Sequence, residues 1–497
     1  MLGLRVRIVG WHVIVGLACW TLSASGKPNF LLLVSEDNGP ELGCYGDPFV
    51  RTPVLDRLAE SGVLFKNAYV PQAGCSQSRA ALYTGLYPHQ NGHIGLATWK
   101  FRLYRPGIPN LVRSLKSSGY RTGIVGKLHM NPESAFPFDF EAISGSNFSR
   151  RHLARYAEEA GRFIKASEEP FFLSVNYPDA HRPFLRSVEG LPERPLTPEE
   201  VVPLPCFGLD TPELRRQTAD YYNSMMRLDA LIGGVLETLQ ASGKADQTVV
   251  IYMGDHGADL LRGKRTSYEG GVRVPLIIRW PASLKRLGGG RVVDQLVSTL
   301  DLYPTLLDLA QARVPQDLSG QSLVPLLDNP DHPWRRYLFT EYHLHSAHNF
   351  YPQRTIRDER FKLIWNLQPG ELNPGYGFTM KRFFEGLAET ISSAPRRIRE
   401  AYLRMERPGE FELYDLESDP HEFHDLSVRS EYVGVFKRLK SELLQWRRLT
   451  SDPLLEESNL RRLRSEVLAC FRDGVPDKSA LQLNYPDYFF ANQSERQ

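Results

Sequence analysis

Short apolar runs alternate with longer amphipathic stretches through the first two thirds of the chain. The run Asn29–Ser35 is bounded by turn formers, which is typical of a strand buried on both faces. Similar runs predict further strands at Thr122–Val125, Phe171–Asn176, Thr248–Met253 and Pro275–Arg279. Helical periodicity lies between them, at Pro53–Ser61, Ser78–Tyr83, Ile108–Ser118 and Thr211–Ala241. This alternation predicts an α/β fold whose mostly parallel sheet is sandwiched by helices.

The pattern changes after about residue 335. The strand-like pieces become shorter, as at Phe361–Trp365 and Phe411–Asp415, and a charged amphipathic helix follows near Tyr432–Leu449. We therefore expect a main domain over residues 26–335 and a smaller α+β region over 336–497, carrying an antiparallel sheet. The last stretch, Asp473–Gln497, is polar and is predicted to be peripheral.

Residues 1–25 have the pattern of a secretory signal peptide. Arg5 and Arg7 precede an apolar run, Ile8–Leu22, and the small residues Ser23–Ser25 follow. The run is shorter than the roughly 20 apolar residues that span a bilayer, and no later stretch is long and apolar enough. We expect an exported protein with no membrane span, periplasmic or extracellular in a bacterial host and lysosomal in an animal one.

Composition excludes some classes of protein. The 60 basic residues nearly balance 58 acidic ones, so no basic field recruits nucleic acid. Removal of the signal leaves Cys44, Cys75, Cys206 and Cys470, too few for a disulfide framework. One pair could still form a bridge, and spacing does not say which. The sequence gives no indication of oligomeric state.

Polar clusters follow the predicted strands where each one ends. They are Glu36-Asp37, Gly126–His129, Asp179–His181 and Gly254–Gly257. In open α/β sheets, ligands bind outside the carboxyl ends of the strands. The sequence therefore predicts that the chemistry is located at this edge.

The segment Cys75-Ser76-Gln77-Ser78-Arg79, with Thr84-Gly85 behind it, resembles the sulfatase signature C-x-P-S-R followed by T-G. The resemblance continues in order through GKLH at 126–129, DHG at 255–257, GKRTSYEGGVRVPLIIRWP at 263–281, STLDLYPTLLDL at 298–309 and ELYDLESDPHE at 412–422. It implies an alkaline-phosphatase-like fold and hydrolysis of sulfate groups. Gln77 departs from the proline or alanine that is usual in the family.

In the family, the signature cysteine is oxidised to formylglycine, whose hydrate is the nucleophile. The resemblance assigns this role to Cys75 and implies a formylglycine-generating enzyme as a partner during maturation. That enzyme reads the short motif that contains residue 77. The glutamine there therefore bears on whether Cys75 is converted to formylglycine. An unconverted thiolate would form an adduct on sulfur with no second hydroxyl to expel sulfate.

The resemblance also implies one divalent metal, held by Glu36, Asp37, Asp255 and His256. Oxygen-rich ligation suits a hard ion, Ca²⁺ first and Mg²⁺ second. Glu36 stands where aspartate is usual, and the nitrogen of His256 leaves the identity of the metal open. Taken singly, any of the carboxylates could instead cap a helix.

The remaining catalytic residues are implied by position in the same motifs. Arg79 would hold the hydrated aldehyde, with Lys127 and His129 beside it. His129 would accept a proton as sulfate leaves, and Asp255 would deprotonate the attacking hydroxyl. Lys264 and His181 would bind sulfate and protonate the leaving group. Outside this set, either histidine could be structural, Lys264 could be a surface charge, and Glu269-Gly270-Gly271 is predicted to be structural.

The segment Glu341–Leu367 resembles the N-sulfoglucosamine sulfohydrolase (sulfamidase) branch of the family. That branch implies a sulfated saccharide as substrate, with an N-sulfate or O-sulfate on a glucosamine unit of heparan-type chains. Candidate substrate contacts are His343, His345, His348 and Arg354. The alternative is that the histidines only pack between the two regions.

Two further functions remain open. A metal-dependent phosphatase of the same superfold would need a serine or threonine nucleophile and a second set of metal ligands, and neither is evident. A non-catalytic glycan-binding pseudo-sulfatase is suggested by the departures at Gln77 and Glu36. Fold alone does not decide among the three.

Overall fold

A computed structural model describes residues 26–281, 288–472 and 474–490 of the chain. The predicted signal segment, residues 1–25, lies outside the described residues. Among the described helices, none combines the length and apolar character needed to cross a membrane.

Within the described residues, the larger of the two main sheets has eight strands in the order β4-β3-β5-β1-β6-β7-β2-β8. Its strands are β1 (Asn29–Ser35), β2 (Val63–Tyr69), β3 (Arg121–Gly126), β4 (Phe140–Ala142), β5 (Phe171–Asn176), β6 (Thr248–Gly254), β7 (Arg273–Arg279) and β8 (Arg291–Ser298). Only β7 runs against its neighbours, β6 and β2, and all the other pairs are parallel. The predicted mostly parallel sheet is confirmed.

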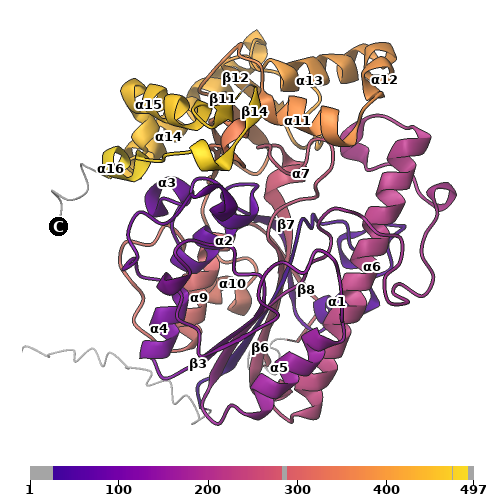
Figure 1. The fold of residues 1–497 in the computed structure, drawn as a ribbon, viewed down its shortest axis with the longest axis vertical. Helices are drawn as coiled ribbons and strands as arrows, with labels where there is room; N and C mark the ends of the chain where they lie inside the picture. The colour runs from indigo at the N-terminus through magenta and orange to yellow at the C-terminus, as the bar shows by residue number, and fades with distance from the viewer. Residues whose placement is uncertain (1–25, 282–287, 473, 491–497) are drawn as a thin grey trace, which may run out of the picture.

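Helices cover both faces of this sheet, and Figure 1 shows α1, α5 and α6 on one side and α2, α4, α9 and α10 on the other. The helices of the main domain are α1 (Pro53–Glu60), α2 (Cys75–Thr84), α3 (Pro88–Asn91), α4 (Leu111–Ser117), α5 (Arg155–Lys165), α6 (Pro212–Ala241), α7 (Glu269–Val272), α9 (Leu302–Leu309) and α10 (Val324–Asp328). Leu31 and Leu33 of β1 pack into the core beside α5 and α6. Phe30 and Leu32 pack into the opposite core. This alternation explains why the strand is apolar throughout.

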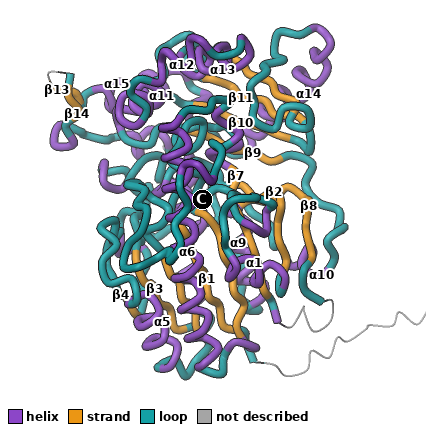
Figure 2. The backbone as a smooth tube through the Cα atoms, turned by 90° about the vertical axis from the view of Figure 1, so that its right-hand side faces the viewer, coloured by secondary structure: helices purple, strands orange, loops and turns teal. Residues whose placement is uncertain are grey.

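A four-stranded antiparallel sheet in the order β12-β11-β10-β9 forms the centre of the C-terminal region. Its strands are β9 (Leu338–Tyr342), β10 (Gln353–Arg357), β11 (Phe361–Asn366) and β12 (Phe411–Asp415), with a small ribbon of β13 (Phe471–Arg472) and β14 (Val475–Pro476). The helices are α11 (Pro374–Phe383), α12 (Leu387–Ser393), α13 (Arg396–Glu406), α14 (Val433–Leu449), α15 (Glu457–Leu468) and α16 (Tyr485–Phe489). Figures 1 and 2 show this region beyond one end of the main sheet.

Several local predictions differ from the structure. The strands β2 and β8 were not predicted, because exposed Lys66 and Asp294 interrupt their apolar pattern. The helix predicted at 108–118 begins at Leu111, since the Asn110 side chain caps it by accepting from the backbone N–H of Arg113. The helix predicted at 78–83 extends back to Cys75.

The prediction of a peripheral C-terminal stretch is wrong for residues 481–490, while most side chains of 474–480 are exposed. Leu481, Tyr485 and Phe489 are buried in a cluster that also contains Phe101. The Tyr485 hydroxyl donates to the carbonyl of Gly92 at 2.7 Å. A few aromatic side chains in a polar segment are enough to attach it to the main domain. The four cysteines of the described chain are all free.

A buried charge network joins the two regions. Arg354 of β10 makes two hydrogen bonds to Asp452, at 2.8 and 2.7 Å, and Arg447 donates to the same carboxylate at 2.6 Å. From the main domain, His89 contacts Glu341 of β9 at 2.6 Å. Glu341 lies 3.7 Å from Arg354, so the two pairs form one network. Buried charges are tolerated because each is paired.

Asp452→Ala should lower the free energy of unfolding by about 3–5 kcal/mol, because it leaves two buried arginines without their shared carboxylate. The measurement is equilibrium unfolding in denaturant. The matched control is Glu400→Ala, which breaks an exposed i,i+4 pair with Arg396 and should change stability far less. Equal effects of the two variants would contradict the network's structural role.

Candidate active site

Cys75 is the first residue of α2 and is only 2% exposed. The helix is preceded by Gly74 in extended backbone and ends at Gly85, whose φ of 66° is left-handed. A helix N-terminus directs backbone N–H groups and the positive end of the helix dipole toward what lies before it. Cys75 therefore lies where negative charge is stabilised.

Three polar side chains surround the sulfur of Cys75. His256 Nε2 lies 3.3 Å from Sγ, Lys264 Nζ lies 3.5 Å away, and Glu36 Oε2 lies 3.7 Å away. These contacts bring the signature cysteine together with residues that follow β1 and β6. The two strands are adjacent and parallel, with Ser35 beside Gly254, which explains how segments so distant in sequence converge.

Arg79 lies one helical turn after Cys75 and faces the same cluster. Its guanidinium donates to Glu36 at 2.5 Å, to Asp255 at 3.2 Å and to Asn176 at 2.6 Å. Lys127 Nζ also donates to Glu36, at 2.8 Å. A carboxylate held by two cations in this way is fixed in both position and charge.

The four predicted metal ligands lie together and are at most 1% exposed: Glu36, Asp37, Asp255 and His256. His256 Nε2 lies 3.2 Å from Asp37 and 3.7 Å from Asp255. With Cys75 or His181 added, subsets of these residues place ligand atoms within 4.8 Å of one another. The arrangement is compact enough for a single cation.

Burial and neighbouring charges shift the pKa values of the acidic groups in this cluster. Burial and the charge of Glu36 raise the pKa of Asp255 to about 7. Burial opposes ionisation of Glu36 as well, but Lys127 and Arg79 hold its pKa well below the usual range. Burial would also raise the pKa of Cys75, yet Lys127 and Lys264 lower it to about 6. Each of the three carboxylates accepts from a buried cation, Glu36 from Lys127, Asp37 from Lys264 and Asp255 from Arg79, and clustered carboxylates are the ligands that a hard metal ion prefers.

The other predicted catalytic side chains border this cluster. Lys264 Nζ donates to Asp37 at 2.9 and 3.1 Å. Burial and the charge of Lys127 lower the pKa of His129 well below its usual value, and its Nδ1 has no hydrogen-bond partner among the described residues. His181 stacks on Phe148 with ring centroids 3.8 Å apart. All six predicted catalytic residues thus lie in one region of the structure.

The predicted substrate contacts separate into two pairs. His343 and Arg354 are fully buried in the network between the regions, where Arg354 Nη2 lies 3.1 Å from His343 Nε2. His345 is 8% exposed. Burial, and after it the charge of Lys264, lower the pKa of His345 well below its usual value. His348 lies between the rings of Trp99 and Phe378. Of the four candidates, His348 is half-buried and His345 is 8% exposed, and it is His345 on which the charges of Lys264 and His256 act.

Several contacts that support the site were not predicted. Asn176, which orients Arg79, ends a predicted strand, and its polar side chain at that position was an available signal. Asp179 binds Arg150 at 2.6 Å and Arg227 at 2.7 Å, and so fixes the turn that leads to His181. Neither arginine lies in a recognisable motif. Sequence reasoning could not find these contacts, because they connect segments far apart in the chain.

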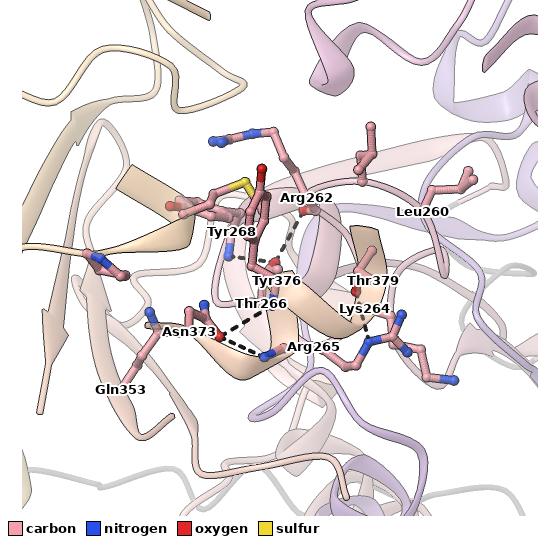
Figure 3. A pocket seen from close by; sticks show the side chains of 14 residues that line it. Leu260, Arg262, Lys264, Arg265, Thr266, Tyr268, Gln353, Asn373, Tyr376 and Thr379 are labelled. Atoms are coloured by element: carbon pink, nitrogen blue, oxygen red, sulfur yellow. Dashed lines mark hydrogen bonds between the residues drawn. The ribbon is translucent and has the colours of Figure 1, made fainter. Parts of the chain in front are cut away.

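The segment Leu260–Tyr268, which carries Lys264, packs against the C-terminal region, as Figure 3 shows. Arg265 Nε contacts Thr379 Oγ1 of α11 at 3.4 Å, and Ser267 donates to Gln353 of β10 at 2.8 Å. The Tyr268 hydroxyl donates to Glu412 of β12 at 2.8 Å. The C-terminal sheet therefore helps to position a residue of the catalytic cluster.

Two models of known protein families match this chain. The family model described as Sulfatase matches residues 28–312, more than half of the chain. The chain belongs to the sulfatase family. A second family model, the C-terminal region of N-sulphoglucosamine sulphohydrolase, matches residues 254–372. The predicted fold class is confirmed, and the protein is an enzyme of the sulfuric ester hydrolase type.

Relatives of this sulfatase include characterised enzymes. Human N-sulphoglucosamine sulphohydrolase is 32% identical over 466 residues, which cover 86% of this chain and 91% of the relative. An ulvan-active sulfatase of Formosa agariphila is 29% identical, covering 87% and 82%. One solved structure shows a protein in complex with its substrate, D-glucosamine-2-N,6-O-disulfate. This chain matches that structure with a TM-score of 0.62 at 21% identity, and the match covers 86% of this chain and 98% of that one. A phosphonate monoester hydrolase of Agrobacterium radiobacter shares the fold, with a TM-score of 0.64 at 21% identity and coverage of 85% and 96%.

Proposed function

We propose that this sulfatase hydrolyses an N-sulfate or O-sulfate on glucosamine units of heparan-type glycans. The observation that carries the proposal is the position of Cys75, with Sγ between His256, Lys264 and Glu36 at 3.3–3.7 Å. The choice of saccharide is supported by the match of residues 254–372 and by the 32% identical human relative. We also propose export through the segment 1–25.

Two groups complete the proposed site: formylglycine made from Cys75 by a formylglycine-generating enzyme, and one divalent metal, Ca²⁺ before Mg²⁺. The metal would be held by Glu36, Asp37, Asp255 and His256. When present, formylglycine supplies the nucleophile and the metal supplies positive charge for the sulfate oxygens. The close carboxylate oxygens of the cluster favour a hard cation, and the nitrogen of His256 leaves room for another metal.

The surrounding cations bind and orient an anionic substrate. Arg79 is fixed by Glu36 and Asn176, so its positive charge stays beside residue 75. Lys127 and Lys264 add further charge on either side of the same position. Cations that are already in position stabilise the charge that builds up as the sulfur–oxygen or sulfur–nitrogen bond breaks, because they do not have to move during the reaction.

Proton transfer would fall to two histidines and one carboxylate. Burial and the charge of Lys127 lower the pKa of His129 and so favour its neutral form, and its Nδ1, which has no hydrogen-bond partner among the described residues, would accept a proton. His181, fixed by its stack on Phe148, would protonate the leaving group together with Lys264. Asp255 would deprotonate the attacking hydroxyl. His345 and His348 are the favoured substrate contacts, while the burial of His343 and Arg354 favours a structural role for that pair.

Cys75→Ala should lower kcat/KM for sulfate release by at least about 1,000-fold, because it removes the source of the nucleophile. Sulfate release from sulfated glucosamines is measured beside thermal unfolding, which should be unchanged. Cys206→Ala, which alters a thiol outside the site, is the matched control and should retain full turnover. Wild-type rates in Cys75→Ala would contradict the mechanism.

Three further measurements distinguish the alternatives. The tryptic peptide Asn67–Arg79 should be about 18 Da lighter than its thiol form, since CHO replaces CH₂–SH. Faster hydrolysis of phosphate esters than of sulfate groups would favour the phosphatase. Binding of sulfated glycan without sulfate release, in protein that carries formylglycine, would favour the pseudo-sulfatase.

His256→Ala and Asp255→Asn should each weaken divalent metal binding by at least about tenfold, because each removes one ligand from a single compact site. Calorimetric titration of metal-free protein with Ca²⁺ and with Mg²⁺ measures this without relying on turnover. Glu41→Gln is the control, since this carboxylate accepts from Tyr221 and lies outside the cluster. Chelation should also reduce sulfate release, and full activity in metal-free protein would exclude the assignment.

A further inference from the structure

Two buried glutamines beside Cys75 donate to the same two backbone carbonyls. Gln77 Nε2 lies 2.7 Å from the carbonyl oxygen of Leu344 and 3.4 Å from that of Ile94. Gln72 Nε2 lies 2.9 Å from the oxygen of Leu344 and 3.3 Å from that of Ile94. Both side chains are fully buried. We call this arrangement of Gln72 and Gln77 around Leu344 the amide clamp.

The backbone of α2 does not require glutamine at position 77. Residue 77 lies in the first turn of the helix, whose intrahelical bonds begin with Ser78 N–H donating to the Gly74 carbonyl. The N–H of residue 77 therefore has no helical partner, and proline would be tolerated there. What the glutamine adds is its side-chain amide. Its Oε1 has no partner among the described residues, so the amide N–H contacts account for its polar interactions.

The clamp holds the segment that carries His345. This segment follows β9 and is attached to the main domain a second time, because Leu96 N–H donates to the carbonyl of His345 at 2.9 Å. Gln72 also lies 3.2 Å from the Nδ1 of His343 through its own Oε1. The carbonyls of Leu344 and His345 are thus both fixed to the main domain, the first of them in part by Gln77 of the helix that begins with Cys75.

His345 is the residue that this attachment places at the site. Its imidazole is 8% exposed, and its Nδ1 is unpartnered among the described residues. No hydrogen bond to another described residue holds the imidazole in place. Its position therefore depends on the backbone, and the backbone is held by the amide clamp.

We infer that Gln77, together with Gln72, is a positioning residue that sets His345 for contact with the sulfated saccharide. This inference rests on the proposed function and adds a role for the residue by which the chain departs from the family signature. The departure at position 77 then preserves substrate binding instead of marking a pseudoenzyme.

The test uses Gln72→Met, because position 72 lies outside the motif read during maturation and methionine keeps the length while removing the donor. Rates are normalised to the formylglycine fraction of each preparation, measured on the peptide Asn67–Arg79. We expect KM for the sulfated glucosamine to rise about three- to tenfold, the scale of one lost hydrogen bond, with kcat changed less than about twofold. Gln90→Met, which loses contacts to Tyr87 and Ser319, controls for a general loss of stability and should leave KM unchanged.

The double variant Gln72→Met/His345→Ala decides whether the clamp acts through His345. Its KM should equal that of His345→Ala alone, since a clamp with nothing to position has no further effect. Fully additive effects, an unchanged KM in Gln72→Met, or an unchanged KM in His345→Ala would each overturn the inference.

Hydrogen exchange separates failure of the clamp from failure of the proposed function. In both Gln72→Met and Gln77→Met, amides of residues 343–346 should exchange faster than in the wild type, while those of β6 should not. If wild-type protein with formylglycine releases no sulfate, the proposed function fails, yet faster exchange still upholds the clamp. Unchanged exchange in both variants would overturn it.

Discussion

The buried carboxylate of Glu36 is the interaction on which the active site depends. It is fully buried and accepts from Arg79 at 2.5 Å and from Lys127 at 2.8 Å. These two contacts join the end of β1 to α2 and to the segment after β3. A carboxylate in such a place is tolerated only while its cations stay in position. The fold and the charge arrangement of the site are therefore maintained together.

The C-terminal region completes a site that the main domain begins. Arg265 and Tyr268, which follow Lys264 in the segment Leu260–Tyr268, contact α11 and β12, and the loop after β9 is held to α2 by the amide clamp. Arg354, Asp452 and Arg447 all belong to the C-terminal region, and the pair of His89 with Glu341 joins their buried network to the main domain. Residues that touch the catalytic cluster are thus fixed from both sides, which is the rigidity that electrostatic stabilisation requires.

Much of the main domain could be predicted from the chain. The strands β1, β5 and β6 are continuous apolar runs, which is the pattern expected of strands that are buried on both faces of a sheet. The strands β2 and β8 escaped prediction because their polar residues face solvent at the side of the sheet. The attachment of residues 481–490 was missed for the opposite reason, since five buried apolar side chains decide its packing within a polar segment: Leu481, Leu483, Tyr485, Phe489 and Phe490.

By itself, the sequence determined the family, the mostly parallel sheet and the chemistry-bearing side chains, because these are expressed in short motifs and in local periodicity. Glu36, Cys75 and Asp255 could each be singled out in this way. Tertiary structure alone decided which side chains hold those residues in place: Asn176 for Arg79, the Arg150–Asp179–Arg227 group for the turn at His181, and Gln72 with Gln77 for the loop of His345. Such contacts join segments far apart in the chain, and hydrogen-bond geometry across that separation has no local pattern by which a single sequence could reveal it.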